Sequence, residues 1–284
     1  LGRGRMKING TAYQDTLVSP GDLIEISGRL LLLCTPTHPH LPALPGSQKA
    51  AHTFAGPDSQ GIVGESPSTW MLRRKIAAIA KHGTHVLILG PSGSGKELVA
   101  RAIHSLSPRT DKALVARNAA TFPEGLIDAE LFGNAKGFPN PGMIERVGLI
   151  GQADGSSLFL DEFGELPSEM QAHRRRVMDE GEYQRLGESQ ARRSEFRLIA
   201  ATNRPADQLK HDVAARLKLR ITLPSLNERR EDIPLIARHL LTGIAARDPA
   251  IIAPFLGTTG SSIPRLSPAL MASLVRHHYT THVR

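Results

Sequence analysis

The sequence of 284 residues contains a single cysteine, Cys34, which excludes an intrachain disulfide and favours a reducing compartment. Aromatic residues make up only 4% of the chain, so a hydrophobic core has to be built mainly from Leu, Ile, Val and Ala. No apolar run approaches the roughly 20 residues that a membrane-spanning helix needs, and no signal-peptide pattern opens the chain. We therefore expect a cytoplasmic protein with no membrane partner.

Acidic residues are outnumbered: 35 Lys and Arg against 27 Asp and Glu give a net charge of +8 at pH 7. This balance permits a polyanionic partner. The arginines are scattered, however, apart from the run Arg174 to Arg176, and a solvated basic surface explains them as well. The length leaves room for one large domain and a small one.

The most informative stretch lies between an apolar run, residues 84 to 89, and a helical pattern, residues 98 to 104. It reads Gly90-Pro91-Ser92-Gly93-Ser94-Gly95-Lys96-Glu97. Strand, glycine-rich turn and helix are the context in which such a sequence binds phosphate, because glycines let backbone N–H groups turn toward an anion at a helix N-terminus. Lys96 can neutralise phosphate oxygens of a nucleotide such as ATP. The residue after the lysine is usually a Ser or Thr that helps to hold Mg²⁺, and here it is Glu97.

Apolar runs that are typical of strands alternate with helical patterns over the rest of this region. They cover residues 113 to 116, 157 to 162, 196 to 203 and 221 to 224. The alternation predicts an α/β fold, with a parallel sheet and helices on both faces. Ligands of such sheets bind at the carboxyl ends of the strands, where Gly90, Asp161 and Asn203 all fall.

Two acids, Asp161 and Glu162, end the apolar run Leu158-Phe159-Leu160. The aspartate can hold Mg²⁺ through water, and the glutamate can orient and deprotonate the water that attacks a phosphate. Asn203 ends the neighbouring strand, where it is placed to sense the γ-phosphate. The alternatives are a surface turn for the two acids and a simple strand-end cap for Asn203.

The pattern along the chain predicts four segments. Residues 1–35 read as short strands, 36–60 form a proline-rich linker, 61–226 form the α/β domain and 227–284 form a truncated helical lid. Ser267 followed by Pro268 is a typical N-cap and first-turn pair, and it opens the last predicted helix. His38 and His40 of the linker have no further ligand at metal-site spacing nearby. His278 and His282 of the lid lie four residues apart but have no metal-site context.

These residues, in this order, resemble the AAA+ ATPase domain of the bacterial enhancer-binding proteins that activate sigma-54 RNA polymerase. The resemblance runs from about Gly61 to Arg284. The motifs that carry it are Gly64-Glu65-Ser66-Pro67, the loop with its Glu97, Glu130-Leu131-Phe132-Gly133, Leu158 to Glu162, Gly187 near Arg185, Ala200 to Asn203, and Glu228 to Ile233. Within residues 1–35, the order Asn9-Gly10, Leu17, Gly21 to Ile24 and Gly28 resembles the last strands of a forkhead-associated domain, a family that binds phosphothreonine peptides.

The resemblance implies further site residues. Asn118 corresponds to an asparagine that pairs with the catalytic glutamate in a nucleotide-dependent switch. Arg216 matches an arginine presented in trans to a neighbour's ATP, and Lys210 stands where a second would be. Arg284 falls on the sensor arginine of the lid, which joins the loop in binding the nucleotide. Family members form ring hexamers with ATP between subunits, and they bind DNA through a helix-turn-helix domain that follows the lid and is not in this sequence.

Three stretches depart from the family pattern. The family contacts sigma-54 with a loop reading Gly-Ala-Phe-Thr-Gly-Ala, whereas the matching stretch Gly137 to Gly142 keeps Phe138, lacks the threonine and reads as one residue shorter. Arg174 and Arg175 replace two leucines. The usual Trp-Pro-Gly-Asn of the lid reads Tyr279-Thr280-Thr281-His282.

We therefore expect a regulator that hydrolyses ATP with Mg²⁺ as a ring oligomer and remodels the sigma-54 RNA polymerase holoenzyme through the loop around Phe138. The alternative is a regulator that binds nucleotide or a partner without productive coupling to sigma-54. A third hypothesis, a small-molecule P-loop kinase, is disfavoured by the Asp161-Glu162 pair and the lid sequence. Steady-state ATP turnover separates the first two hypotheses, and added small acceptors would reveal the third.

Overall fold

The computed structural model describes most of the chain, in two compact units. One unit contains the described residues up to Met71 and from Leu226 to Thr280, and the other contains those from Leu72 to Ser225. Most of the predicted linker and Arg284 lie outside the described residues. The described ranges are 6–13, 15–36, 55–123, 125–166, 171–209, 215–252, 255 and 266–280, without the side chains of 171–175, 206, 249 and 252.

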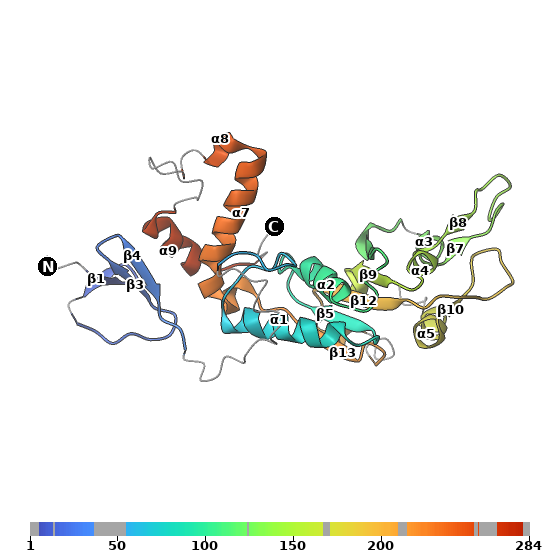
Figure 1. The fold of residues 1–284 in the computed structure, drawn as a ribbon, viewed down its shortest axis with the longest axis horizontal. Coiled ribbons are helices and arrows are strands. Elements are labelled where there is room, and N and C mark those ends of the chain that lie inside the picture. The colour runs from blue at the N-terminus through green and yellow to red at the C-terminus, as the bar shows by residue number, and fades with distance from the viewer. Residues whose placement is uncertain are drawn as a thin grey trace. The chain divides into compact units, whose positions relative to one another are not determined.

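The unit from Leu72 to Ser225 is built on a five-stranded sheet (Figure 1). Every neighbouring pair of strands is parallel, which confirms the predicted α/β class. The central strand is buried along its whole length. In spatial order the strands are β13 (Leu219–Thr222), β5 (Val86–Leu89), β12 (Arg197–Thr202), β9 (Ser157–Asp161) and β6 (Val115–Asn118).

All five strands fall in predicted apolar runs, although the two edge strands are shifted. β6 extends to Asn118 where the prediction ended at Ala116, and β13 begins at Leu219 where the prediction began at Ile221. Each edge strand contains an exposed arginine, Arg117 or Arg220. A search for runs of apolar residues misses exposed arginines of this kind, because edge strands are only partly buried.

Helices and short 3-10 turns connect these strands. Leu72, Ile76 and Ile79 are buried on the first helix as predicted, whereas Met71 is 41% exposed. Its position lies one residue before the buried stripe, about 100° around the helix. The elements are α1 (Pro67–Ala80), α2 (Lys96–Ser105), α3 (Ile127–Phe132), α4 (Leu149–Gln152), α5 (Gln171–Glu180), η1 (Ala119–Thr121), η2 (Phe163–Glu165) and η4 (Ala206–Gln208).

Arg197 opens the central strand β12 and is fully buried although it is charged. Its guanidinium donates from Nε to the carbonyl of Thr84 (3.1 Å), from Nη1 to Ala80 (3.1 Å) and from Nη2 to Ile79 (2.7 Å). Two of these carbonyls close α1, where a helix leaves backbone acceptors without partners and favours a cation. Burial lowers the pKa of Arg197 to about 10, so the side chain stays charged at neutral pH while it caps the helix.

Two short hairpins extend from this unit. The first pairs β7 (Gly133–Asn134) with β8 (Arg146–Val147), and the second pairs β10 (Glu182–Tyr183) with β11 (Arg192–Arg193). We call them the first and second hairpins. The predicted partner loop, Gly137 to Gly142, belongs to the first hairpin.

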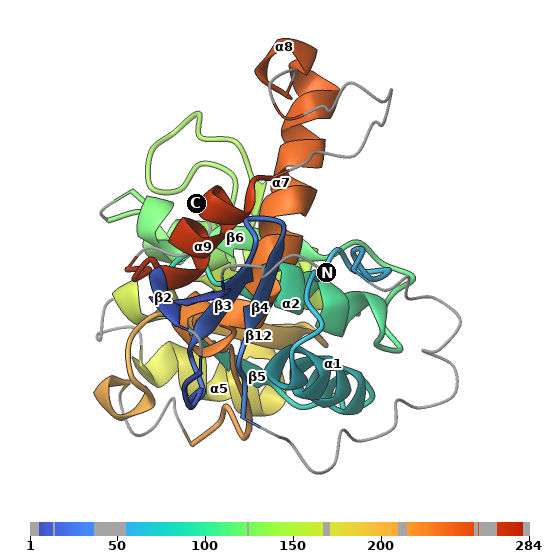
Figure 2. The same ribbon diagram turned by 90° about the vertical axis from the view of Figure 1, so that its left-hand side faces the viewer.

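The other unit begins with an antiparallel sheet in the order β2-β1-β3-β4, which confirms the short strands expected before residue 36. Asn9 and Gly10 form the first turn with φ of 52° and 90°, as a type I′ hairpin requires. Figure 2 shows β3 and β4 side by side. The strands are β1 (Met6–Ile8), β2 (Thr11–Tyr13), β3 (Leu23–Ile26) and β4 (Leu30–Leu33).

The same unit contains the helices predicted after residue 226. The hydroxyl of Ser267 accepts a hydrogen bond from the N–H of Leu270 at 3.2 Å, so the predicted N-cap is present. None of the helices within the described ranges is both long and apolar enough to cross a bilayer. The elements are η5 (Leu226–Glu228), η6 (Arg230–Asp232), α7 (Ile233–Arg247), α8 (Pro249–Ile252) and α9 (Pro268–Arg276).

Asp232 joins two of the sequence motifs within this unit. Its fully buried carboxylate accepts hydrogen bonds from the N–H groups of Glu65 and Ser66, both at 2.7 Å. It also accepts from the hydroxyls of Ser66 and Thr69, both at 2.6 Å. Gly64 lies so close that an added Cβ would be 2.5 Å from the carboxylate. The motif at Gly64 and the motif that ends at Ile233 therefore form one structural element.

Candidate active site

The carboxyl edge of the five-stranded sheet brings the predicted site residues together. Asn118 is the register partner of Asp161, and Thr202 is the register partner of Leu89. The N–H of Gly90 donates to the carbonyl of Thr202 at 3.3 Å. The glycine-rich loop therefore starts beside the end of β12, as the parallel arrangement predicts.

The loop between β5 and α2 can be formed only with glycine at several positions. An added Cβ at Gly90 would lie 2.9 Å from the Ser94 hydroxyl and 3.0 Å from Cβ of Leu223. Gly93 and Gly95 have φ of 76° and 100°, in the left-handed region. Gly95 is also the N-cap of α2 and offers no side-chain cap, so the first N–H groups of this helix remain to bind an anion.

Lys96 is the first residue of α2, directly after this loop, and is only 5% exposed. Its ammonium group donates to the carbonyls of Gly90 (3.2 Å) and Pro91 (3.3 Å), so the charge is held over the loop. Glu97 is exposed, and its carboxylate pairs with Arg101 one turn along α2 at 2.7 Å. Lysine and loop together form a site suited to a phosphate group.

The two acids follow directly at the end of β9. Asp161 Oδ1 accepts a hydrogen bond from the N–H of Glu162 at 3.0 Å. Glu162 has φ of 49° and ψ of 41°, a left-handed conformation that costs on the order of 1 kcal/mol for a residue with a side chain. The strained residue is therefore the one for which the sequence predicts a catalytic role.

Two asparagines lie on either side of the acids. The amide oxygen of Asn118 accepts from the N–H of Ala120 at 2.9 Å and so caps η1. Asn203 is exposed just after β12, and the hydroxyl of the buried Thr202 accepts from the N–H of Arg204 at 3.1 Å. Both asparagines reach the predicted edge. Pairing of Asn118 with Glu162 stays a prediction.

No group of three or more His, Cys, Asp or Glu within the described ranges is placed to hold a metal ion by itself. Mg²⁺ at Asp161 would therefore take its other ligands from phosphate oxygens and water, which is how this ion is commonly held beside nucleotides. The exposed, arginine-paired Glu97 does not replace the missing hydroxyl next to the loop lysine. Asp161 therefore stays the residue for which the sequence predicts contact with the ion.

Arg216, the predicted trans arginine, lies shortly before β13. Its Nε is 3.0 Å from Oδ1 and 3.1 Å from Oδ2 of Asp179, near the end of α5. The sequence did not indicate Asp179, because 37 residues separate the two. Two further predictions lie outside the described residues: Lys210, at the position of a second trans arginine, and Arg284, the predicted sensor arginine. The side chains of Arg174 and Arg175 lie outside them as well.

The first hairpin presents an apolar tip. Phe138 is 39% exposed and Ile144 is 81% exposed, with Met143 exposed beside them. The buried amide of Asn134 donates to the carbonyls of Ala135 (3.1 Å) and Ile144 (3.0 Å) and holds the base of the hairpin together. The sequence predicted Phe138 but missed Met143 and Ile144, although three apolar residues in one loop are a signal for a partner surface.

The second hairpin supports the first. The N–H of Leu186 donates to the carbonyl of Gly133, and the N–H of Ala135 donates to the carbonyl of Leu186, both at 2.9 Å. An added Cβ at Gly187 would lie 2.6 Å from Cβ of Phe138. Gly187 has φ of 79°, so both its conformation and its surroundings require glycine.

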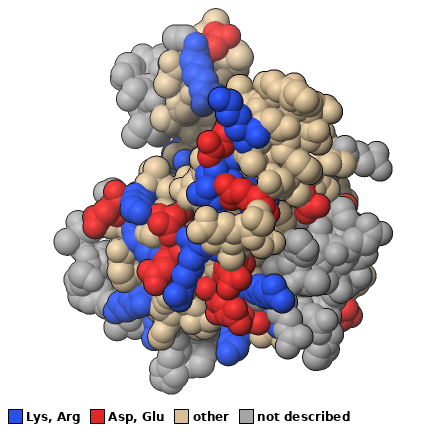
Figure 3. Space-filling model, turned by 90° about the vertical axis from the view of Figure 1, so that its right-hand side faces the viewer, with Lys and Arg blue, Asp and Glu red and all other residues tan. Residues whose placement is uncertain are grey.

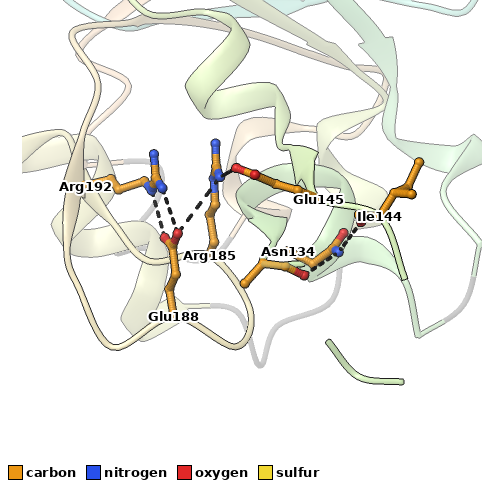
Figure 4. A network of polar contacts seen from close by, with 7 residues as sticks. Asn134, Ile144, Glu145, Arg185, Glu188 and Arg192 are labelled. Atoms are coloured by element: carbon orange, nitrogen blue, oxygen red, sulfur yellow. Dashed lines mark hydrogen bonds and ion pairs between the residues drawn. The ribbon is translucent and has the colours of Figure 1, made fainter. Parts of the chain in front are cut away.

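An ionic network reinforces this contact (Figure 4). The buried Arg185 pairs with Glu145 of the first hairpin and lies 4.0 Å from Glu188. Arg192 pairs with Glu188 at 2.7 Å and lowers the pKa of that carboxyl. The two hairpins are thus joined by backbone, packing and ionic contacts.

The surface charge does not gather into a patch on the face drawn in Figure 3. Basic and acidic side chains are interspersed there among the coloured residues. On this face, the charge distribution is therefore compatible with a solvated surface. A polyanionic partner was the other explanation considered for the net positive charge.

The comparisons with known proteins agree with the geometry. The family described as "Sigma-54 interaction domain" matches residues 62–226, more than half of the chain. The transcriptional regulatory protein ZraR of Salmonella typhimurium is 39% identical over 231 residues, which is 79% of this chain and 50% of that protein. The DNA-binding transcriptional regulator NtrC of Escherichia coli is 40% identical over 214 residues, 72% of this chain and 45% of that protein.

A solved structure is similar as well. The crystal structure of NtrX from Brucella abortus in complex with ADP superposes with a TM-score of 0.68 at 32% sequence identity. The match covers 80% of this chain and 49% of NtrX. The chain therefore spans about half the length of the relatives reported above.

Proposed function

Because the chain belongs to the Sigma-54 interaction domain family, we propose that it hydrolyses ATP and uses the energy to remodel RNA polymerase that carries sigma-54. The observation that carries this proposal is the convergence of Lys96, Asp161 and Glu162 at one edge of the sheet. A regulator of this kind works in the cytoplasm, in keeping with its similarity to ZraR and NtrC.

The loop and the helix bind the phosphates of ATP. The residues from Gly90 to Glu97 surround the phosphate groups, and the ammonium of Lys96 moves from the loop carbonyls to the β- and γ-phosphate oxygens. The NtrX structure, which contains ADP, supports a nucleotide at this fold. Mg²⁺ held by Asp161 would neutralise charge on the same oxygens.

Glu162 acts as the general base of the reaction. Its carboxylate accepts a proton from the attacking water as the bond between water oxygen and γ-phosphorus forms. The bond between γ-phosphorus and the bridging oxygen of the β-phosphate breaks, and ADP and phosphate are the products. Asn118 and Asn203, at the ends of the flanking strands, orient Glu162 and sense the γ-phosphate respectively. The sheet register, with Asn118 opposite Asp161, supports the role of Asn118.

Arg216 completes the nucleotide site of a neighbouring subunit. Arg284, in the lid, contacts the nucleotide bound to its own chain. An arginine supplied in trans stabilises the charge of the transition state and makes hydrolysis depend on assembly. We therefore propose a ring oligomer, and in keeping with the family a hexamer, with ATP between subunits.

The tip of the first hairpin binds sigma-54. Phe138, Met143 and Ile144 offer an exposed apolar surface on a hairpin that the second hairpin supports. The similarity to sigma-54 regulators does not favour the alternative, a regulator without productive coupling to sigma-54. We therefore propose that the loop from Gly137 to Gly142, which stands in place of Gly-Ala-Phe-Thr-Gly-Ala, binds sigma-54 through apolar contacts.

We also propose the segment boundaries predicted above, with residues 1–35 as the end of a forkhead-associated domain, 36–60 as a linker, 61–226 as the ATPase domain and 227–284 as the lid. The four-stranded antiparallel sheet that begins at Met6 supports a β domain at this place. A titration with phosphothreonine peptides tests whether the segment binds them.

ATP turnover measured against protein concentration, with light scattering in parallel, tests the proposed function. Turnover per subunit should rise as the chain assembles, because Arg216 acts only across an interface. A gel shift with sigma-54 should appear only with a transition-state analogue such as ADP–aluminium fluoride. A rate per subunit that is flat from nanomolar to tens of micromolar, with only monomer present, would contradict the shared site.

A further inference from the structure

We propose that Asp179 is the positioning residue for Arg216, and that it fixes the guanidinium at the end of α5 so that it meets a neighbour's ATP in one orientation. The inference rests on the proposed function, in which Arg216 acts in trans. It assigns a role to an acid that no sequence motif contains.

The contact between the two side chains defines an orientation. Nε of Arg216 lies 3.0 Å and 3.1 Å from the two carboxylate oxygens of Asp179. The side chain of Arg216 is 21% exposed, so most of it is held against the protein. Both contacts are made by Nε, the guanidinium nitrogen nearest the main chain. The carboxylate therefore holds the base of the guanidinium and limits its rotation.

Asp179 is itself on a fixed support. Its neighbour Met178 accepts a hydrogen bond at its carbonyl from Nε2 of His85, at 3.0 Å, just before β5. Gly181, which follows α5, donates from its N–H to the carbonyl of Val177 at 3.0 Å and accepts from the N–H of Ser194 at 2.9 Å. The last turn of α5 is thus tied to the sheet on one side and to the second hairpin on the other.

The main chain beside Arg216 is also anchored. Leu217 is fully buried in the hydrophobic core, directly before β13. The negative end of the α5 dipole favours a cation at this place. Arg216 therefore has a buried neighbour beside its main chain, and Asp179 contacts its guanidinium.

A positioning role predicts a specific kinetic effect. An ion pair with a half-exposed carboxylate contributes little to stability, so removing Asp179 should leave the fold intact. The guanidinium would then lose the contact that fixes its Nε, and a misplaced catalytic group can slow a reaction on the order of a hundredfold. Binding of ATP, which depends on the loop at Lys96 of the other subunit, should not change.

The test uses the whole chain at a protein concentration that saturates assembly. Asp179→Ala should lower kcat on the order of tenfold to a hundredfold with KM for ATP unchanged. Asp179→Asn keeps an oxygen that can accept from Nε and should lose less activity. Glu180→Ala, which removes an exposed acid from the same helical turn, is the matched control and should keep the parental kcat. Light scattering and the melting temperature verify that each variant assembles and folds.

The decisive variant combines Asp179→Ala with Arg216→Ala. If Asp179 acts through Arg216, the double variant has the kcat of Arg216→Ala alone. A further loss in the double variant, or a parental or raised kcat for Asp179→Ala, would overturn the positioning role while leaving Arg216 as the trans arginine. If Arg216→Ala itself turns over ATP at the parental rate, the proposed role of Arg216 is wrong and this inference fails with it.

Discussion

Asn118 and Asp161 are register partners at the carboxyl edge of the sheet, where β6 and β9 run parallel. The next residue along β9 is Glu162, whose left-handed conformation ends the strand. Three side chains of the predicted site are therefore placed by one pair of strands. The glycine-rich loop, for which phosphate binding is proposed, is placed by two further strands, β5 and β12.

Replacement of Lys96 by alanine should weaken ATP binding. The substitution removes a charge-assisted contact to phosphate, worth about 1.5–3 kcal/mol. A titration with fluorescent ATP measures the change, with Lys81→Ala as the control because Lys81 is exposed beyond the end of α1. Equal affinity of Lys96→Ala and the parent would rule out the phosphate-binding loop.

Replacement of Glu162 by glutamine should separate binding from hydrolysis. The attacking water loses its base, so kcat should fall by roughly a hundredfold or more while affinity for ATP stays near that of the parent. Single-turnover hydrolysis measures the chemical step, and Glu182→Gln is an exposed control on the second hairpin. Parental hydrolysis by Glu162→Gln would exclude a catalytic role for this residue.

Replacement of Gly187 by alanine should weaken binding of sigma-54 without slowing hydrolysis. The added methyl group meets Phe138 at 2.6 Å, and alanine is strained at φ of 79°, by about 1 kcal/mol. A gel shift of sigma-54 with ADP–aluminium fluoride, alongside an ATPase assay, measures both effects. Gly83→Ala is the matched control, because an added Cβ at Gly83 meets no atom within 4 Å. Parental sigma-54 binding by Gly187→Ala would show that this contact does not set the position of Phe138.

Stability should fall as the pH decreases below neutrality, in part because of His85. Burial lowers the pKa of His85, and its Nδ1 accepts from the N–H of Leu198 at 2.9 Å, which requires an unprotonated nitrogen. Between the usual value near 6.5 and the lower folded value, the unfolded chain binds a proton that the folded chain does not. The stabilisation is thus complete above the usual value and is lost as the pH falls through the folded one.

Melting temperatures between about pH 7.5 and pH 5.5 measure this dependence. His85→Asn should reduce the decrease, whereas His82→Asn, at an exposed site, should retain it. Burial also lowers the pKa of His104, so part of the dependence should remain in His85→Asn. An identical pH profile for His85→Asn and the parent would show that His85 does not contribute.

Local patterns predicted the sheet and the edge where the site lies. The glycines from Gly90 to Gly95 and the apolar runs that precede Gly90 and Asp161 are contiguous in sequence, so their structure follows from neighbouring residues. The family resemblance added Asn118 and Arg216, which have no local signal. The roles of these residues stay predictions, although the structure brings Asn118 to the expected edge.

Long-range polar contacts could not be predicted. Asp232 is bound by residues up to 167 positions away, and Arg197 caps α1 with bonds to carbonyls up to 118 positions away. The sequence placed Arg197 within the strand predicted over residues 196 to 203. Only the folded arrangement shows that its side chain also caps the end of a helix.

The hydrogen bonds at the base of the first hairpin make its loop an exchangeable part. Asn134 donates to the carbonyl of Ile144, and Leu186 bonds to Gly133 and Ala135, so none of these bonds involves residues 139 to 142. Those residues can therefore be replaced without redesigning the frame. Grafting Gly-Ala-Phe-Thr-Gly-Ala, or the loop of another regulator, onto this frame offers a way to transfer partner choice between regulators while the ATPase remains the same.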